Sequence, residues 1–122
     1  MIRRPVICAW LTAIVLCGCG ATPPQAPLPD AMKLDSGTSG ISTACGLAYQ
    51  VTAFPGNHSD DLATLESTAT TAAGKVALVY SRNPAWIYQG ETVRQIVAQS
   101  LSMLSSCGLH RSAAALLRET SR

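Results

Sequence analysis

The sequence predicts an all-α protein: a small three- to four-helix bundle with one disulfide, preceded by a flexible tether. The bundle is expected over residues 41–122, where apolar side chains recur with the helical period. The tether is expected over residues 19–40, which contain four Pro and three Gly and show little apolar periodicity. A chain of 122 residues is long enough for one small domain.

Four helical segments are expected in order. The first begins at Ile41 and ends at Pro55-Gly56, because this dipeptide cannot continue a helix. The second begins with Ser59 as N-cap, has Asp60 and Asp61 in its first turn, and ends at Asn83-Pro84. The apolar stripes of these two segments are Ile41, Ala44, Cys45, Ala48, Val51 and Thr52, and then Leu62, Leu65, Ala69, Ala72, Val76 and Val79.

The third helix is expected to start within residues 89–91 and to end at Gly108, in the position of a C′ glycine. Its stripe is Val93, Val97, Ser100, Leu104 and Cys107, flanked by Ile96 and Met103. A short fourth segment, Arg111 to Thr120, would add Ala113, Leu116 and Leu117 to the core. Because much of the apolar content is Ala, this core stabilises the fold weakly, and a covalent cross-link is expected to support it.

The first residues have the pattern of a secretory signal peptide, assigned here to residues 1–18. Arg3 and Arg4 precede an uncharged run of 12 residues, Val6 to Cys17, which is shorter than the roughly 20 apolar residues that a membrane-spanning helix needs. These two arginines also account for the formal net charge of +2. From Cys19 onward the chain is formally neutral.

The end of this segment, Leu16-Cys17-Gly18-Cys19, resembles the lipobox of bacterial lipoproteins. In that family the thiol of the last cysteine receives a diacylglyceryl group, and a dedicated peptidase then cleaves before it. The resemblance implies that Cys19 is lipidated and becomes the first residue of the mature protein. Cys17 departs from the Ala or Ser that is usual at its position.

Processing and pairing account for all five cysteines. Cys8 and Cys17 leave with the signal, and Cys19 becomes a thioether. Cys45 and Cys107 remain, each on the apolar stripe of its own helix, and an oxidising compartment favours a disulfide between them. The alternative is a pair of free buried thiols.

The composition argues against several classes of function. No cluster of Lys and Arg is present to contact nucleic acid. The polar cluster His58-Ser59-Asp60-Asp61 is explained by helix capping, and His110 is expected on the surface, so no metal site, catalytic residue or cofactor is expected. The Gly-x-Ser-x-Gly, Walker and dinucleotide-binding motifs are absent from the sequence.

The connection 83–90 contains Trp86 and Tyr88, which are candidates for partner binding because each offers apolar area with a polar group. The competing interpretation, favoured because aromatic residues are scarce, is that Trp86 and Ile87 fold back and close the end of the bundle.

These features predict a non-enzymatic lipoprotein on the extracytoplasmic face of the cell membrane. It would bind or modulate an envelope or membrane protein, in one version as a phage-type exclusion factor. An alternative is a small carrier of a lipid or apolar ligand, which would need a closed pocket of several hundred Å³. A hydrolase ranks last, since it would need His58 or His110 beside a nucleophile.

Overall fold

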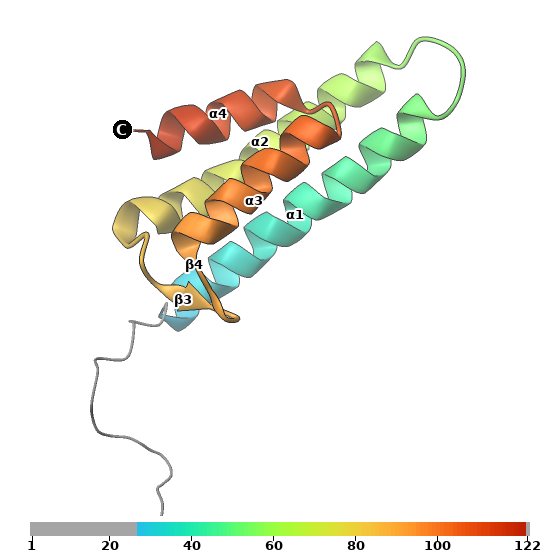
Figure 1. Cartoon of the computed structure of the whole chain (residues 1–122). Helices are drawn as coiled ribbons and strands as arrows, with labels where there is room; N and C mark the ends of the chain where they lie inside the picture. Colours follow the sequence, from blue (N-terminus) through green and yellow to red (C-terminus); the bar gives the residue numbers. More distant parts are fainter. Residues whose placement is uncertain (1–26, 122) are drawn as a thin grey trace, which may run out of the picture.

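The computed structural model describes residues 27–121, which form four helices and a short β-hairpin (Figure 1). The elements are α1 Leu28–Thr52, α2 Ser59–Arg82, β3 Ile87–Tyr88, β4 Glu91–Thr92, α3 Val93–Ser106 and α4 His110–Thr120. The predicted all-α fold class, with four helices and a disulfide, is confirmed.

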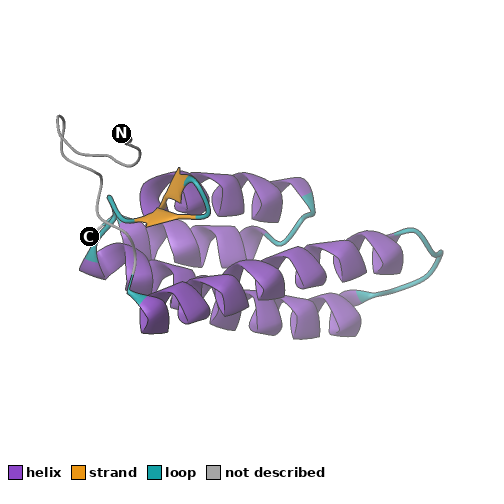
Figure 2. Ribbon diagram, turned by 90° about the horizontal axis from the view of Figure 1, so that it is seen from below, coloured by secondary structure: helices purple, strands orange, loops and turns teal. Residues whose placement is uncertain are grey.

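Helices α1 and α2 form a long antiparallel hairpin against which α3 and α4 pack (Figure 2). Helix α4 contacts α2 and α3, and α3 contacts all three other helices. The α1–α2 hairpin extends beyond the turn that joins α3 to α4, so its closed end protrudes from the bundle (Figures 1 and 2). We call this protruding part, residues 46–65, the distal tip. The opposite end, where α1 begins and the β-hairpin lies, is called the proximal end.

The core runs along the centre of the bundle and is rich in Ala, as the composition predicted, and also in Val. Its fully buried members include Leu34, Ile41, Val76, Leu104 and Leu116. The predicted α2 stripe is confirmed: four of its residues are buried, and Leu62 and Leu65 are half-buried against the core.

Helix α1 begins 13 residues earlier than predicted, at Leu28 instead of Ile41. Residues 28–40 are therefore helix, and assigning them to the tether was wrong; residues 19–26 lie outside the described residues. Two features explain the difference. Pro29 lies in the first turn of α1, where a proline costs no hydrogen bond. Asp30, Leu34 and Gly37 also continue the buried stripe backward from Ile41 at helical spacing.

The glycines in this segment serve close packing rather than flexibility. A Cβ added to Gly37 would lie 2.9 Å from both the carbonyl oxygen of Ala72 and the Cγ2 of Val76. One added to Gly40 would lie 2.8 Å from the Cβ of Ala72. Helices α1 and α2 therefore approach closely here, and only glycine fits without movement of the α2 backbone.

Replacing Gly37 with Ala is expected to lower the free energy of unfolding by about 1–2 kcal/mol, because the overlap with α2 outweighs the gain in helix propensity. Gly46 in the same helix is the matched control, since an added Cβ there meets nothing within 4 Å. Gly46→Ala should raise the free energy of unfolding by about 0.5–1 kcal/mol. Urea denaturation measures both, and stabilisation by both variants would contradict the close approach.

Helix α2 starts one residue earlier than predicted, and its capping differs from the prediction. Ser59 is the first helical residue and His58 occupies the N-cap position without a side-chain cap. The side chain of Asn57 instead accepts a hydrogen bond from the Ser59 amide at 2.9 Å. Asp60 and Asp61 lie in the first turn as predicted.

The third helix starts at Val93, later than predicted, because residues 87–92 form the antiparallel β3–β4 hairpin. Gln89 and Gly90 form its two-residue turn with φ of 51° and 84°, the left-handed values of a type I′ turn. Thr92 then caps α3 in a capping box: its hydroxyl accepts from the Gln95 amide, and the Gln95 side chain accepts from the Thr92 amide.

The end of α3 agrees with the prediction. Gly108 has φ of 86°, and the amides of Gly108 and Leu109 donate to the carbonyls of Ser105 and Leu104, which is a Schellman motif. Three side chains assigned to the core stripes are in fact exposed: Thr52, Met103 and Leu117. Each lies at the edge of its stripe, where neighbouring helices do not cover it.

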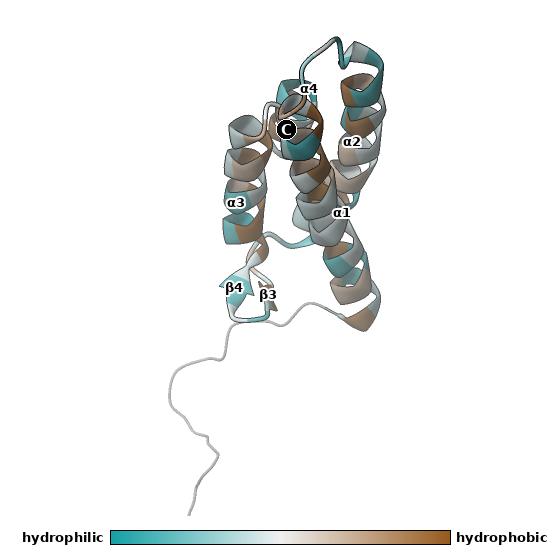
Figure 3. Cartoon of the chain, turned by 90° about the vertical axis from the view of Figure 1, so that its right-hand side faces the viewer, coloured by the Kyte–Doolittle hydropathy of each residue, from teal (hydrophilic) through white to brown (hydrophobic). Residues whose placement is uncertain are grey.

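Hydropathy is mixed along every helix (Figure 3). Among residues 27–121, no helix is both long and apolar enough to cross a membrane.

Candidate functional site

The disulfide between Cys45 and Cys107 joins the middle of α1 to the end of α3, as predicted. The two Cα atoms are 5.4 Å apart, and the cysteines are separated by 62 residues in the sequence. Both side chains are buried, with exposed fractions of 3% and 8%. The bond is therefore part of the core and shielded from solvent. Cys19, the predicted lipidation site, lies outside the described residues.

The predicted partner-binding residues Trp86 and Tyr88 lie at the proximal end, where both are half-buried and pack against the core. The carbonyl of Trp86 accepts from the Val93 amide at 2.8 Å, which fixes the connection to the start of α3. This arrangement supports the interpretation that Trp86 closes the end of the bundle.

Tyr88 links the β-hairpin to α1. Burial raises the pKa of Tyr88 above its ordinary value, and a hydrogen bond to the carboxylate of Asp35, together with its negative charge, raises this pKa further. Both effects favour the protonated phenol, the form that can donate to the Asp35 carboxylate. The Gln89 side chain in turn donates to the Tyr88 hydroxyl at 3.4 Å.

An ion pair joins the two helix ends at the proximal end. The guanidinium of Arg82, in the last turn of α2, donates to the carboxylate of Asp30, in the first turn of α1. The Asp30 side chain is only 5% exposed, whereas that of Arg82 is 48% exposed. A buried carboxylate of this kind requires its partner, so the pair fixes the start of α1 against α2.

The distal tip exposes aromatic side chains. Tyr49 is 56% exposed and Phe54 is 68% exposed. Phe54 also lines a shallow hollow of about 350 Å³, together with Gln50, Val51, His58 and Asp61. The Nε2 of His58 donates to the carbonyl of Phe54 at 2.6 Å, which holds the loop after α1 closed.

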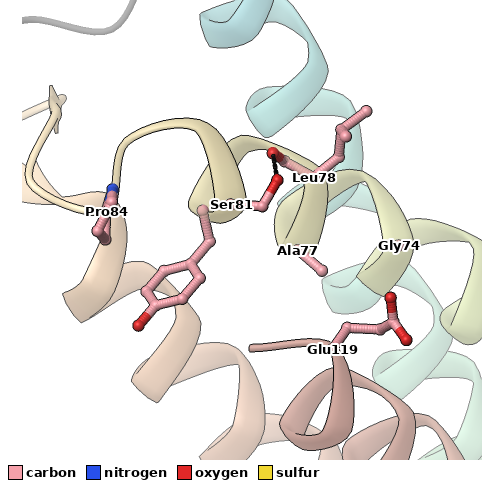
Figure 4. Close-up of a pocket in the computed structure, with 7 residues that line it drawn as sticks. Gly74, Ala77, Leu78, Ser81, Pro84 and Glu119 are labelled. Carbon is pink, nitrogen blue, oxygen red and sulfur yellow. Dashed lines mark hydrogen bonds between the residues drawn. The ribbon is translucent and has the colours of Figure 1, made fainter. Parts of the chain in front are cut away.

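A second hollow is a groove of about 720 Å³ between α2 and the end of α4 (Figure 4). It is lined by Gly74, Ala77, Leu78, Tyr80, Ser81, Pro84 and Glu119. The groove is open to solvent and carries polar groups, including the Ser81 hydroxyl, which donates to the Leu78 carbonyl at 2.7 Å. It does not have the enclosed form that a lipid carrier would need.

A polar network that the sequence analysis missed attaches α4 to α2. The carboxylate of Glu66 accepts hydrogen bonds from the backbone amides of Arg111 and Ser112 at 3.3 and 2.9 Å, and from the Ser112 hydroxyl at 2.7 Å. Ser112 is fully buried and also lies 3.0 Å from the Thr70 hydroxyl. Glu66 therefore caps the first turn of a helix to which it does not belong.

Replacing Glu66 with Ala is expected to lower the free energy of unfolding by about 1–2 kcal/mol, because the first-turn amides of Arg111 and Ser112 lose their acceptor. The Ser112 hydroxyl keeps the backbone carbonyl of residue 66 as an acceptor, at 3.0 Å. The amides of Arg111 and Ser112 should exchange with solvent faster. Glu66→Gln keeps one acceptor oxygen and should cost less. Urea denaturation measures the free energy of unfolding of both variants, and hydrogen exchange measures the exchange rates of the two amides. Unchanged amide exchange in Glu66→Ala would contradict the capping role.

Neither histidine is hydrogen-bonded to a serine, threonine or cysteine side chain within residues 27–121. His58 is engaged by a backbone carbonyl, and His110 is exposed at the first residue of α4. The same part of the chain contains no group of three His, Cys, Asp or Glu arranged to hold a metal ion.

No protein-family model, curated protein or solved structure matches the chain.

Proposed function

We propose that the protein is a lipoprotein anchored to the membrane through Cys19, and that its helical bundle acts by binding an envelope or membrane protein. The lipobox-like residues Leu16 to Cys19 support the anchor. The buried Cys45–Cys107 disulfide supports export, since such bonds persist in oxidising compartments.

The observation that carries the binding proposal is that the two ends of the bundle differ. The chain arriving from Cys19 enters α1 at the proximal end, whereas Tyr49 and Phe54 are exposed at the distal tip. A helix of 25 residues is about 37 Å long, so α1 places these aromatic rings far from the point of attachment. Exposed aromatic residues of this kind are typical of protein-binding surfaces. Trp86 and Tyr88 contribute mainly to closure of the proximal end.

Photocrosslinking in the native membrane tests the binding proposal. A benzophenone amino acid in place of Phe54 is expected to give a crosslinked envelope protein. The matched control places the same residue at Ser39, which is exposed on α1 away from the distal tip. Crosslinks of equal yield at both positions, or none at either, would contradict binding through the distal tip.

A further inference from the structure

Two large apolar side chains are exposed at the start of α1. Leu28 is 73% exposed and Met32 is 66% exposed. They are four residues apart and therefore neighbours on one face of the helix, while Leu34 in the next turn is fully buried. The proximal end thus presents an apolar pair to its surroundings that the described bundle does not cover.

The length of chain before α1 restricts what this pair can meet. Leu28 follows Cys19 by nine residues. Nine residues span at most about 32 Å when fully extended. With Cys19 acylated, as proposed above, the start of α1 is held at high effective concentration next to the lipid surface.

The charges at the two ends of the bundle favour contact of the proximal end, and not of the distal tip, with a lipid surface. The charged side chains near the start of α1 and the β-hairpin include equal numbers of basic groups, Lys33, Arg82 and Arg94, and acidic groups, Asp30, Asp35 and Glu91. These acidic groups are engaged by Arg82, Tyr88 and Gln99 respectively. Residues 46–65 of the distal tip, by contrast, include Asp60 and Asp61 and no Lys or Arg. An anionic lipid surface repels the distal tip but not the neutral proximal end.

We propose that the proximal end of the bundle rests on the bilayer, with Leu28 and Met32 inserted at the boundary between headgroups and acyl chains. The partner of this surface is the lipid itself. The inference depends on the proposed anchor, since two side chains alone give little affinity and the acyl chains on Cys19 supply the local concentration. It orients the distal tip away from the membrane.

Tryptophan quenching by brominated lipid tests this orientation. Trp86 is the only tryptophan after Cys19, so a Trp86→Phe background is free of other signals once the signal peptide is removed. Met32→Trp places the probe at the proximal end. Phe54→Trp is the matched control at the distal tip, because Met32 and Phe54 have nearly equal exposed fractions of 66% and 68%. The acylated proteins are reconstituted in phosphatidylcholine–phosphatidylglycerol vesicles, and circular dichroism verifies that both variants remain folded.

The emission of Met32→Trp is expected to fall by roughly half on brominated vesicles, since an interfacial side chain is buried about 5–10 Å into the lipid. That of Phe54→Trp should remain unchanged. Equal quenching of the two probes, or no quenching of Met32→Trp in protein that floats with the vesicles, would overturn the orientation and leave the anchor intact. Protein that is not acylated and does not float would overturn both the anchor and the orientation.

Discussion

Replacing Cys19 with Ala is expected to move the protein from the membrane to the soluble fraction and to abolish acylation. Each acyl chain contributes about 0.8 kcal/mol per buried CH₂, and stable anchoring needs two such signals. The membrane-bound fraction should therefore fall by roughly tenfold or more. Fractionation with immunodetection measures the effect.

Cys17→Ala is the control for this change. It removes a neighbouring thiol but places a usual residue at that position of the lipobox, so processing and anchoring should persist. Retention of Cys19→Ala in the membrane at the level of the unmodified protein would contradict lipidation at this residue.

The second large effect is expected from removing the disulfide. Cys45→Ala combined with Cys107→Ala should lower the free energy of unfolding by about 4 kcal/mol, because the bond closes a long loop in the unfolded chain. Small domains have total stabilities of about 5–15 kcal/mol, so this loss is a large share. The core is rich in Ala, and its small side chains bury little apolar area, so hydrophobic burial cannot offset this loss of stability.

Chemical reduction of the unmodified protein provides the control. Reduced protein should unfold at nearly the same urea concentration as the double variant, since both lack the same cross-link. An unchanged urea midpoint in the double variant and in reduced protein would contradict a stabilising role for the bond.

Helices with regular apolar spacing could be predicted from the sequence, because their buried face repeats along the chain. The α2 stripe and the positions of Cys45 and Cys107 are examples. The start of α1 could not be predicted in this way, because Gly37 and Gly40, considered from the sequence alone, suggest a flexible segment. Their role depends on the backbone of α2, which lies about 35 residues away in the sequence.

The start of α3 could be predicted from neighbouring residues, whereas the cap of α4 could not. The capping box of Thr92 and Gln95 is visible in the sequence and would have placed the start of α3 correctly. The Gln89-Gly90 turn is a weaker signal than the Asn-Gly or Asp-Gly turns typical of hairpins. The capping of α4 by Glu66 carries no local signal, because the carboxylate comes from another helix.

The distribution of exposed groups connects the fold to the proposed function. The Asp30–Arg82 pair holds the start of α1 against the end of α2, and Tyr88 links the β-hairpin to α1. The distal tip then presents Tyr49 and Phe54 at the opposite end of α1. The proposed lipid contact and the proposed protein-binding surface therefore lie at opposite ends of the bundle.

The intact mass of the mature protein tests the anchor most directly. The protein is extracted from its membrane without reductant and treated with a thiol-alkylating reagent before the mass is measured. The expected mass is that of a chain starting at Cys19 with a diacylglyceryl thioether, two hydrogens lost to the Cys45–Cys107 bond, and no alkylated cysteine. A chain that begins at another residue, or one in which Cys19 takes up the alkylating reagent, would contradict the account.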